Sequence, residues 1–234
     1  MTHAHVTLSG KRLTTPRSAA VAGILFAILF STSIALIRLG LPTGPIESEV
    51  WLEKGARLTK LALGLMPFAG IAFLWFEGVV RDRLGAYEDQ FFSTVFFGSG
   101  LLFLAMIFAA SAIAGGLTVT YSANPAEFTS SDVYLFGRAI MSQFFTIYAL
   151  RMAGVFVISV GTIWLRTGLM PRWLSLITYL FALILLLSTT LNLWMVMVFP
   201  GWVLIISVYI LVLNLRQKEP GAKDGMTTSP ANEK

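Results

Sequence analysis

The sequence has 234 residues, of which 56% are hydrophobic and only 12% are charged, with a net charge of +5. Its mean hydropathy of +0.77 excludes an ordinary soluble domain and predicts a protein that resides in a lipid bilayer. The chain has no cysteine, and its two histidines, His3 and His5, precede the first apolar run. Disulfides, thiolate metal sites and histidine-ligated haem within the membrane are therefore excluded, and we expect no metal and no cofactor.

Six apolar runs define the predicted fold. A helix needs roughly 20 apolar residues to cross about 30 Å of hydrocarbon, and the runs that qualify are 19–37, 58–80, 91–114, 138–165, 173–191 and 200–215. The last two come from one apolar stretch, which we divide at Asn192 to Phe199 because Pro200 suits the first turn of a helix. A turn at Ser188 or at Gly201 is the alternative. The pattern predicts an all-α fold, a polytopic membrane helix bundle with six transmembrane helices.

The bundle is predicted to form one domain, 18–216, between a cytoplasmic N-terminal tail, 1–17, and a disordered cytoplasmic tail, 217–234, which is poor in apolar side chains. Six crossings place both ends on one side, and the distribution of Lys and Arg indicates which side. The side of the termini carries Lys11, Arg12, Arg17, Arg81, Arg83, Arg166, Arg172, Arg216, Lys218, Lys223 and Lys234, and the other side carries Arg38, Lys54, Arg57, Lys60 and Arg138.

This distribution predicts a bacterial cell membrane protein with both termini in the cytoplasm. The basic charge follows from that topology and needs no nucleic acid to explain it. Membrane lipids are the expected partners, with anionic headgroups at the cytoplasmic face.

The first run follows a basic N-terminus, as a secretory signal does. The run is long, however, and the following "RLGLPTGP" lacks a small-x-small cleavage site, so we predict a retained first span. In the next segment, 43–60, Glu53 and Arg57 are spaced as a favourable helical pair. We interpret this segment as a solvated rim, with an interfacial amphipathic helix or an extension of the second span as alternatives.

The second span carries Glu77, the only carboxylate inside a predicted span. Arg81 follows four residues later, which predicts an ordinary i, i+4 ion pair at the interface. A proton relay is the alternative, but it would need more titratable groups along a path than the apolar spans supply. Pro67, in the same span, is expected to release the carbonyl of Leu63 and to kink the helix.

The third span contains "FFGSG", in which Ser99 resembles the nucleophile of an intramembrane serine protease. Phe97 stands where that motif requires glycine, and no span supplies a histidine base. Ala105, Ala109 and Ala112 recur at helical spacing and predict close helix packing. The loop that follows, 115–137, has no Lys or Arg, and the fourth helix is expected to begin there at a Ser or Asp cap, well before the hydrocarbon.

Arg151 lies near the middle of the fourth span, about 20 Å from either end along the helix and beyond complete snorkelling. An unpaired charge at that depth costs from about 3 kcal/mol to more than ~10 kcal/mol, so the guanidinium is expected to face the bundle interior. Tyr148 and Thr162 share its helical face and are predicted to join it in a ligand-binding site. The same face carries Ile140, Phe144, Gly154 and Ile158.

Two interpretations of Arg151 remain open. It joins helices through backbone carbonyls and hydroxyls, or it receives an anion such as a lipid phosphate or a carboxylate. Glu77 is expected to lie at too shallow a depth to pair with it. The candidate partners are the Leu63 carbonyl, Ser188, Thr189, Thr190 and Asn192.

The segment "RTGLMPRW" joins the fourth and fifth spans. Gly168 suits a helix C-cap and Pro171 the start of the next helix, while Trp164 and Trp173 are expected at the membrane surface. This turn, with "PFAGIAFLWFEGVVRDRLG" and "FFTIYALRMAG", resembles a group of small, functionally uncharacterised six-helix bacterial integral membrane proteins. The resemblance implies a six-helix bundle and no particular activity.

We interpret the chain as a non-enzymatic membrane bundle that binds or moves a small anionic or amphipathic molecule, such as a lipid, near Arg151. No catalytic residue is predicted. The alternative is a structural or assembly subunit whose partner is another membrane protein or a second copy of the chain. In that case the packing faces would carry Ala105, Ala109, Gly154 and Gly161.

Overall fold

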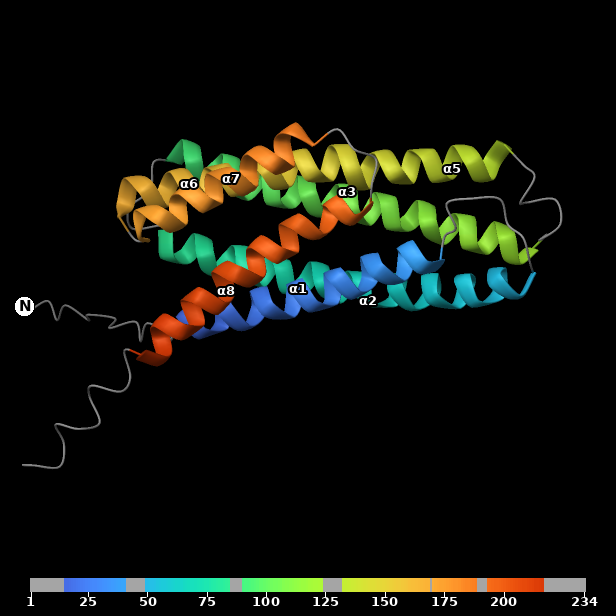
Figure 1. Ribbon diagram of the computed structural model, residues 1–234, viewed down its shortest axis with the longest axis horizontal. Coiled ribbons are helices and arrows are strands. Elements are labelled where there is room, and N and C mark those ends of the chain that lie inside the picture. The colour runs from blue at the N-terminus through green and yellow to red at the C-terminus, as the bar shows by residue number, and fades with distance from the viewer. Residues whose placement is uncertain are drawn as a thin grey trace, which may run out of the picture.

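The computed structural model describes residues 15–40, 49–84, 90–123, 132–168, 170–188 and 193–216. These ranges are helical and contain no strand, which confirms the all-α prediction (Figure 1). The helices are α1 (Thr15–Gly40), α2 (Glu49–Leu84), α3 (Gln90–Ala123), α5 (Asp132–Gln143), α6 (Ala149–Thr167), α7 (Arg172–Leu187) and α8 (Val198–Arg216), with a π-helical turn η1 (Phe144–Tyr148) and a 3-10 turn η2 (Leu193–Met197). The tail predicted for 217–234, and most of that predicted for 1–17, lie outside the described residues.

Five helices are long and apolar enough to cross a membrane: Arg17–Gly40, Lys54–Arg81, Phe91–Ser122, Asp132–Thr167 and Leu193–Leu213. The fourth combines α5, η1 and α6 into one continuous helix. It begins at Asp132, within the loop where its start was predicted, and its 36 residues rise about 54 Å, more than a bilayer requires. The second crossing helix begins at Glu49, so the segment interpreted as a solvated rim extends the second span instead.

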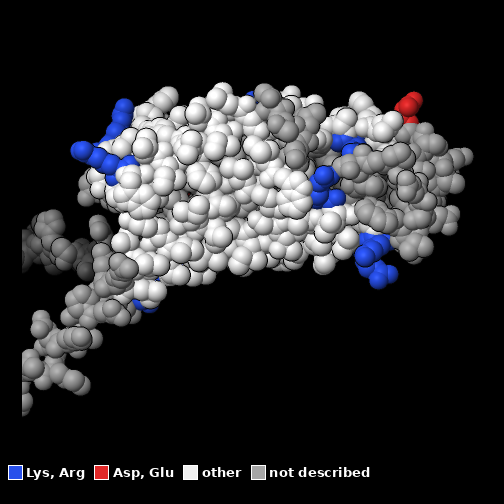
Figure 2. Space-filling view, in the orientation of Figure 1, with Lys and Arg blue, Asp and Glu red and all other residues white. Residues whose placement is uncertain are grey.

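Charged residues mark the limits of an apolar belt around the bundle. Arg38 lies 21 positions after Arg17 on α1, and Arg81 lies 21 positions after Lys60 on α2. Each interval rises about 32 Å, close to the thickness of the hydrocarbon core. Figure 2 shows the corresponding surface, a broad region free of charged side chains with Lys and Arg near both ends. The belt supports the conclusion that this is a multi-pass membrane protein.

The start of α1 and the end of α8 lie at the same end of the bundle, here called the terminal end (Figure 1). The end of α2 and the start of α3 lie there too, whereas the start of α2 and the end of α3 lie at the opposite end. The helices α1, α2 and α3 and the continuous helix formed by α5, η1 and α6 each connect the two ends, while α7 leaves the terminal end and α8 returns to it. This arrangement agrees with the predicted placement of both chain ends on one side.

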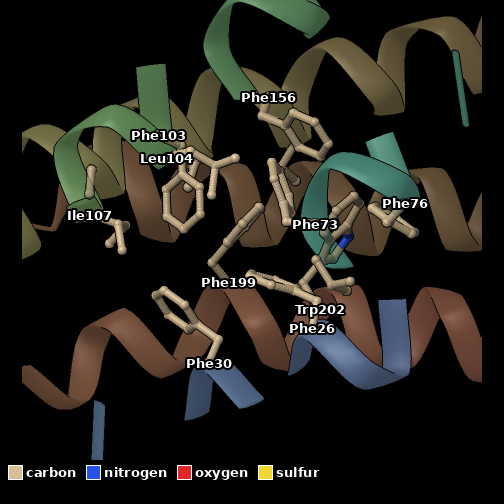
Figure 3. Close-up of a cluster of buried hydrophobic side chains, with 14 of the residues drawn as sticks. Phe26, Phe30, Phe73, Phe76, Phe103, Leu104, Ile107, Phe156, Phe199 and Trp202 are labelled. Carbon is tan, nitrogen blue, oxygen red and sulfur yellow. The ribbon is translucent and has the colours of Figure 1, made fainter. Parts of the chain in front are cut away.

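Aromatic rings fill the middle of the belt (Figure 3). The Phe199 ring centroid lies 4.6 Å from that of Phe103, 5.7 Å from those of Phe73 and Phe156, and 5.9 Å from that of Phe26. Lipid tails are as apolar as these rings, so the hydrophobic effect contributes little and close packing must hold the helices together. Each favourable ring pair adds about 0.5–1.5 kcal/mol. This ring cluster joins α1, α2, α3, α6 and α8.

The hairpin formed by α7 and α8 turns inside the belt. Leu186, near the end of α7, packs against Gly154 of α6, and Phe199, the second residue of α8, belongs to the ring cluster. Figure 1 shows that α7 and α8 accompany only the part of the long helices nearer the terminal end. The 16 residues of α7 rise about 24 Å, which is less than a full crossing.

The predicted boundaries in this region need correction. The fifth span was expected to reach Leu191, but α7 ends at Leu187 and the backbone of Ser188 is extended. The break therefore begins at Ser188, which was the alternative, and not at Asn192. Pro200 is the third residue of α8 and lies in its first turn, as predicted.

Candidate functional site

Arg151 is the third residue of α6 and lies at an intermediate depth in the belt. Phe156, five residues farther along α6, contacts Phe73 of α2 with ring centroids 5.4 Å apart. Phe73 lies 13 residues from Lys60, the boundary at the opposite end. At 1.5 Å per residue, Arg151 is therefore about 12 Å inside that boundary and about 20 Å from the level of Arg81.

The guanidinium of Arg151 is half-buried and is turned back along its own helix. Its Nη1 donates a hydrogen bond of 3.1 Å to the carbonyl oxygen of Ile147. Ile147 belongs to η1, where the Ala149 N–H donates to the Phe144 carbonyl, one residue farther back than in an α-helix. In such a π turn, backbone carbonyls accept from N–H groups one residue farther along than in an α-helix, and these turns are frequent at functional sites. The bond supplies a dipole for Arg151 but no negative charge.

The predicted companions of Arg151 do not form one pocket with it. Tyr148 is 55% exposed and its ring lies 5.8 Å from that of Phe144. Thr162, eleven residues beyond Arg151, donates to the Ile158 carbonyl and shares a 2.8 Å hydrogen bond with the Tyr179 hydroxyl. Along the helix, Thr162 is about 16 Å from Arg151. Tyr148 therefore lies beside Arg151 on the surface, whereas Thr162 belongs to the contact between α6 and α7.

The end of α7 supplies a buried polar group at a similar depth. Gly154 packs against Leu186, so Ser188, two residues farther along α7, is close in depth to Arg151. The Ser188 hydroxyl is buried and has no hydrogen-bond partner. Thr189, Thr190 and Asn192 lie outside the described residues. Nearby, η2 packs against η1 and α1. Two segments whose backbone departs from the α-helix therefore meet at this depth, where neighbouring helices shield them from lipid, as a membrane requires.

Pro67 interrupts the hydrogen bonding of α2 at about the same depth. It lies six residues from Phe73 towards Lys60, and Arg151 lies five residues from Phe156 in the same direction. Leu63, whose carbonyl Pro67 releases, packs its side chain against Gly115 of α3.

Glu77 differs most from the prediction. It is fully buried, and neither carboxylate oxygen has a hydrogen-bond partner. Arg81 makes no hydrogen bond to the Glu77 carboxylate, and its guanidinium lies 4.6 Å from the centre of the Phe97 ring on α3. The predicted interfacial ion pair is therefore wrong. Gly100 of α3 lies against the carboxylate, where a side chain would collide with it, and the glycine in "GSG" was the available sequence signal.

The small residues of α3 and α6 have different roles. Ser99 donates a 2.9 Å hydrogen bond to the Phe96 carbonyl, which fits the expected packing role. Ala105 and Ala112 are exposed and Ala109 is half-buried, so this face of α3 is not covered by the described helices, and its packing against a partner stays a prediction. Gly154 and Gly161 do pack against α7, next to Leu186 and Thr178.

The turn between α6 and α7 follows the prediction closely. Gly168 has a φ of +66° and its N–H donates a 3.0 Å hydrogen bond to the Trp164 carbonyl, as a glycine C-cap does. Pro171 immediately precedes α7. Trp173 is 55% exposed, whereas Trp164 lies near the level of Arg81 but is buried between helices and stacks on Trp202.

A groove of about 680 Å³ lies between α1 and α2. Its walls are almost entirely apolar, with Arg17 and Ser18 as the polar lining residues. The α1 side extends from Arg17 to Leu29, about 18 Å along the helix, which slightly exceeds half the thickness of the hydrocarbon core. The groove can accommodate an acyl chain of the leaflet at the terminal end, with its headgroup near Arg17.

Comparison with known proteins adds no relative: no family model, curated protein or solved structure matches the chain.

Proposed function

We propose that this protein binds, or moves along the bundle, an anionic amphiphile whose acidic group pairs with Arg151. The observation that carries the proposal is an arginine at a helix position about 12 Å inside the belt, with a neutral carbonyl of its own helix as hydrogen-bond partner. A cation at that depth costs several kcal/mol unless an anion or water compensates it. An acidic headgroup would supply the missing charge.

The surroundings of Arg151 support lateral entry from the lipid. Tyr148 and Ile158 lie on the same helical face and are both exposed, Ile158 at 36%. An acyl chain can lie along this face while its headgroup reaches the guanidinium. The buried hydroxyl of Ser188, which has no partner, supplies a further donor at a similar depth.

The likeness to small bacterial six-helix membrane proteins and the cytoplasmic location of both termini belong to the same proposal. The excess of Lys and Arg on the side of the termini supports that orientation.

Lipid binding to matched variants tests the proposal. The protein, reconstituted in phosphatidylcholine nanodiscs containing phosphatidylglycerol, is expected to retain phosphatidylglycerol during native mass spectrometry. Arg151→Gln should lose at least ten-fold of that binding, corresponding to about 1.4 kcal/mol, whereas Arg38→Gln at the belt boundary should not. Arg151→Lys keeps the charge and should retain part of the binding.

The same experiment separates the alternatives. Loss of the lipid in Arg17→Gln and not in Arg151→Gln would assign binding to the groove between α1 and α2 and contradict the site at Arg151. Equal binding by all variants would also contradict it. Co-purification of one reproducible membrane protein would favour the assembly subunit, which the exposed Val133, Leu135 and Phe136 of α5 make the second candidate.

A further inference from the structure

Glu77 occupies a site that the proposed function does not use. Its side chain is fully buried between α2 and α3, and both carboxylate oxygens lack a hydrogen-bond partner. Gly100 provides the space, because a Cβ at that position would overlap the carboxylate. Gly98, two residues earlier on the same helix, has open space around it. Gly100 therefore leaves a space beside Glu77 that one carboxyl group fills, and this space is called the cradle below.

The packed helices give Glu77 little electrostatic compensation. The helices in extensive contact with α2 are α1 and α3, and the Phe73 ring also meets Phe156 of α6 and Phe199 of α8. The charged residues of α6 are Arg151 and Arg166, and the Arg166 guanidinium lies over the Phe92 ring, while that of α8 is Arg216 at its end. The sequence of α3 contains no Asp, Glu, Lys, Arg or His, and its tyrosine, Tyr121, is near its far end. The charged residues of α1 are Arg17 and Arg38, near its two ends. Arg81, on α2 itself, is the described cation nearest in sequence, and its guanidinium is held over Phe97.

An ionised carboxylate in this cradle would be a buried charge without a hydrogen bond, which costs many kcal/mol in a medium of low dielectric constant. A carboxylic acid is neutral and avoids most of that cost. Intramembrane carboxyl groups that face the interior of a bundle commonly serve as proton sites. The geometry therefore favours one particular ligand, the proton.

We propose that Glu77 is a proton-binding site, occupied when α2 and α3 pack as they do in this structure. Release of the proton converts the carboxylic acid to a carboxylate, and the proton passes to water at the terminal end of the bundle. Arg81 lies one helical turn away on the same face, at the spacing of an i, i+4 pair. In the deprotonated state its guanidinium leaves the Phe97 ring and pairs with the carboxylate, which separates α2 from α3 at this level.

Infrared spectroscopy of the full chain in lipid tests this assignment directly. A protonated carboxyl group has a C=O stretching band that an ionised carboxylate lacks. At pH 7 we expect this band in the unaltered protein and its loss in Glu77→Gln, which replaces the carboxyl with an amide of similar shape. Labelling all glutamates with ¹³C should shift the same band in the unaltered protein, so the assignment does not depend on the folding of the variant.

A pair of glycine variants tests the cradle. Gly100→Ala places a methyl group on the carboxylate position and should abolish or shift the band, whereas Gly98→Ala, on the same helix, should leave it unchanged. Absence of a ¹³C-sensitive band at pH 7 would overturn the proposal, as would a band that persists in Glu77→Gln. None of these outcomes depends on lipid binding at Arg151, so the two proposals can fail separately.

Discussion

At the residue scale, Glu77 and Arg81 show how a neighbouring helix changes a local preference. Their spacing on α2 suits an ion pair worth about 0.2–0.5 kcal/mol on an isolated helix. In the bundle, Phe97 of α3 offers Arg81 the face of an aromatic ring at 4.6 Å, an interaction worth about 0.5–2 kcal/mol. Gly100 meanwhile leaves space for the carboxyl group of Glu77. A second helix therefore decided which atoms surround both side chains.

Glycines in α6 have a predictable effect on stability. A Cβ at Gly154 would lie 2.7 Å from Cγ of Leu186 and 3.3 Å from its backbone nitrogen, so Gly154→Ala must displace α7. We expect a loss of about 1–3 kcal/mol, typical of overpacking, measured as a lower thermal midpoint in detergent. Gly78→Ala is the matched control, because nothing lies within 4 Å of its Cβ position. An unchanged midpoint for Gly154→Ala would contradict the close contact between α6 and α7.

At the element scale, α7 and α8 are the informative pair. Their apolar sequences are typical of two ordinary spans, but α7 ends beside Gly154 and α8 begins at the ring cluster. The connection between them therefore lies within the belt. Neighbouring helices satisfy and enclose such irregular backbone, which would be too costly if it were exposed to lipid. The depth of this turn brings Ser188 and η2 close to the level of Arg151.

The depth of the α7–α8 turn can be measured by electron paramagnetic resonance. The chain has no cysteine, so a spin label attached to Leu187→Cys reports on one site. We expect the collision rates of this label with oxygen and with a water-soluble nickel chelate to match those of a label at Leu74→Cys, which lies beside Phe73 in the belt. A profile that matches Lys54→Cys, beyond Lys60, would show that α7 reaches the membrane surface.

At the scale of the whole molecule, the topology follows from the ends of the bundle. The start of α1 and the end of α8 share one end (Figure 1), and the order of the predicted spans assigns most Lys and Arg residues to that side. Arg172 and Lys54 are exposed near the terminal and opposite ends respectively. They therefore provide matched positions for determining the orientation in a cell.

Cysteine accessibility tests the orientation. In intact cells, a membrane-impermeant maleimide should label Lys54→Cys and should label Arg172→Cys only after permeabilisation, because positively charged loops are retained in the cytoplasm. Labelling of Arg172→Cys in intact cells, with protection of Lys54→Cys, would reverse the topology. Labelling of both positions would contradict a single orientation.

The sequence by itself determined the properties that depend on local composition. In lipid, the backbone N–H and C=O groups of a long apolar run can be hydrogen-bonded only within a helix, so the all-α fold and the first four helices could be predicted. The glycine cap at Gly168 could be predicted from the local sequence of the turn. Arg151 was conspicuous because a single charge stands out in an apolar run. Each of these inferences needs only the chain and its solvent.

Only the tertiary structure decided which side chains meet. The spacing of residues on one helix contains no information about the opposing helix, so it could not show that α3 would place Gly100 against Glu77 and Phe97 beneath Arg81. Hydropathy likewise does not record where a helix ends within an apolar stretch. The end of α7 beside Gly154 and the separation of Thr162 from Arg151 depend on contacts between helices. Hydropathy cannot predict these contacts, because lipid tails and the protein interior are almost equally apolar.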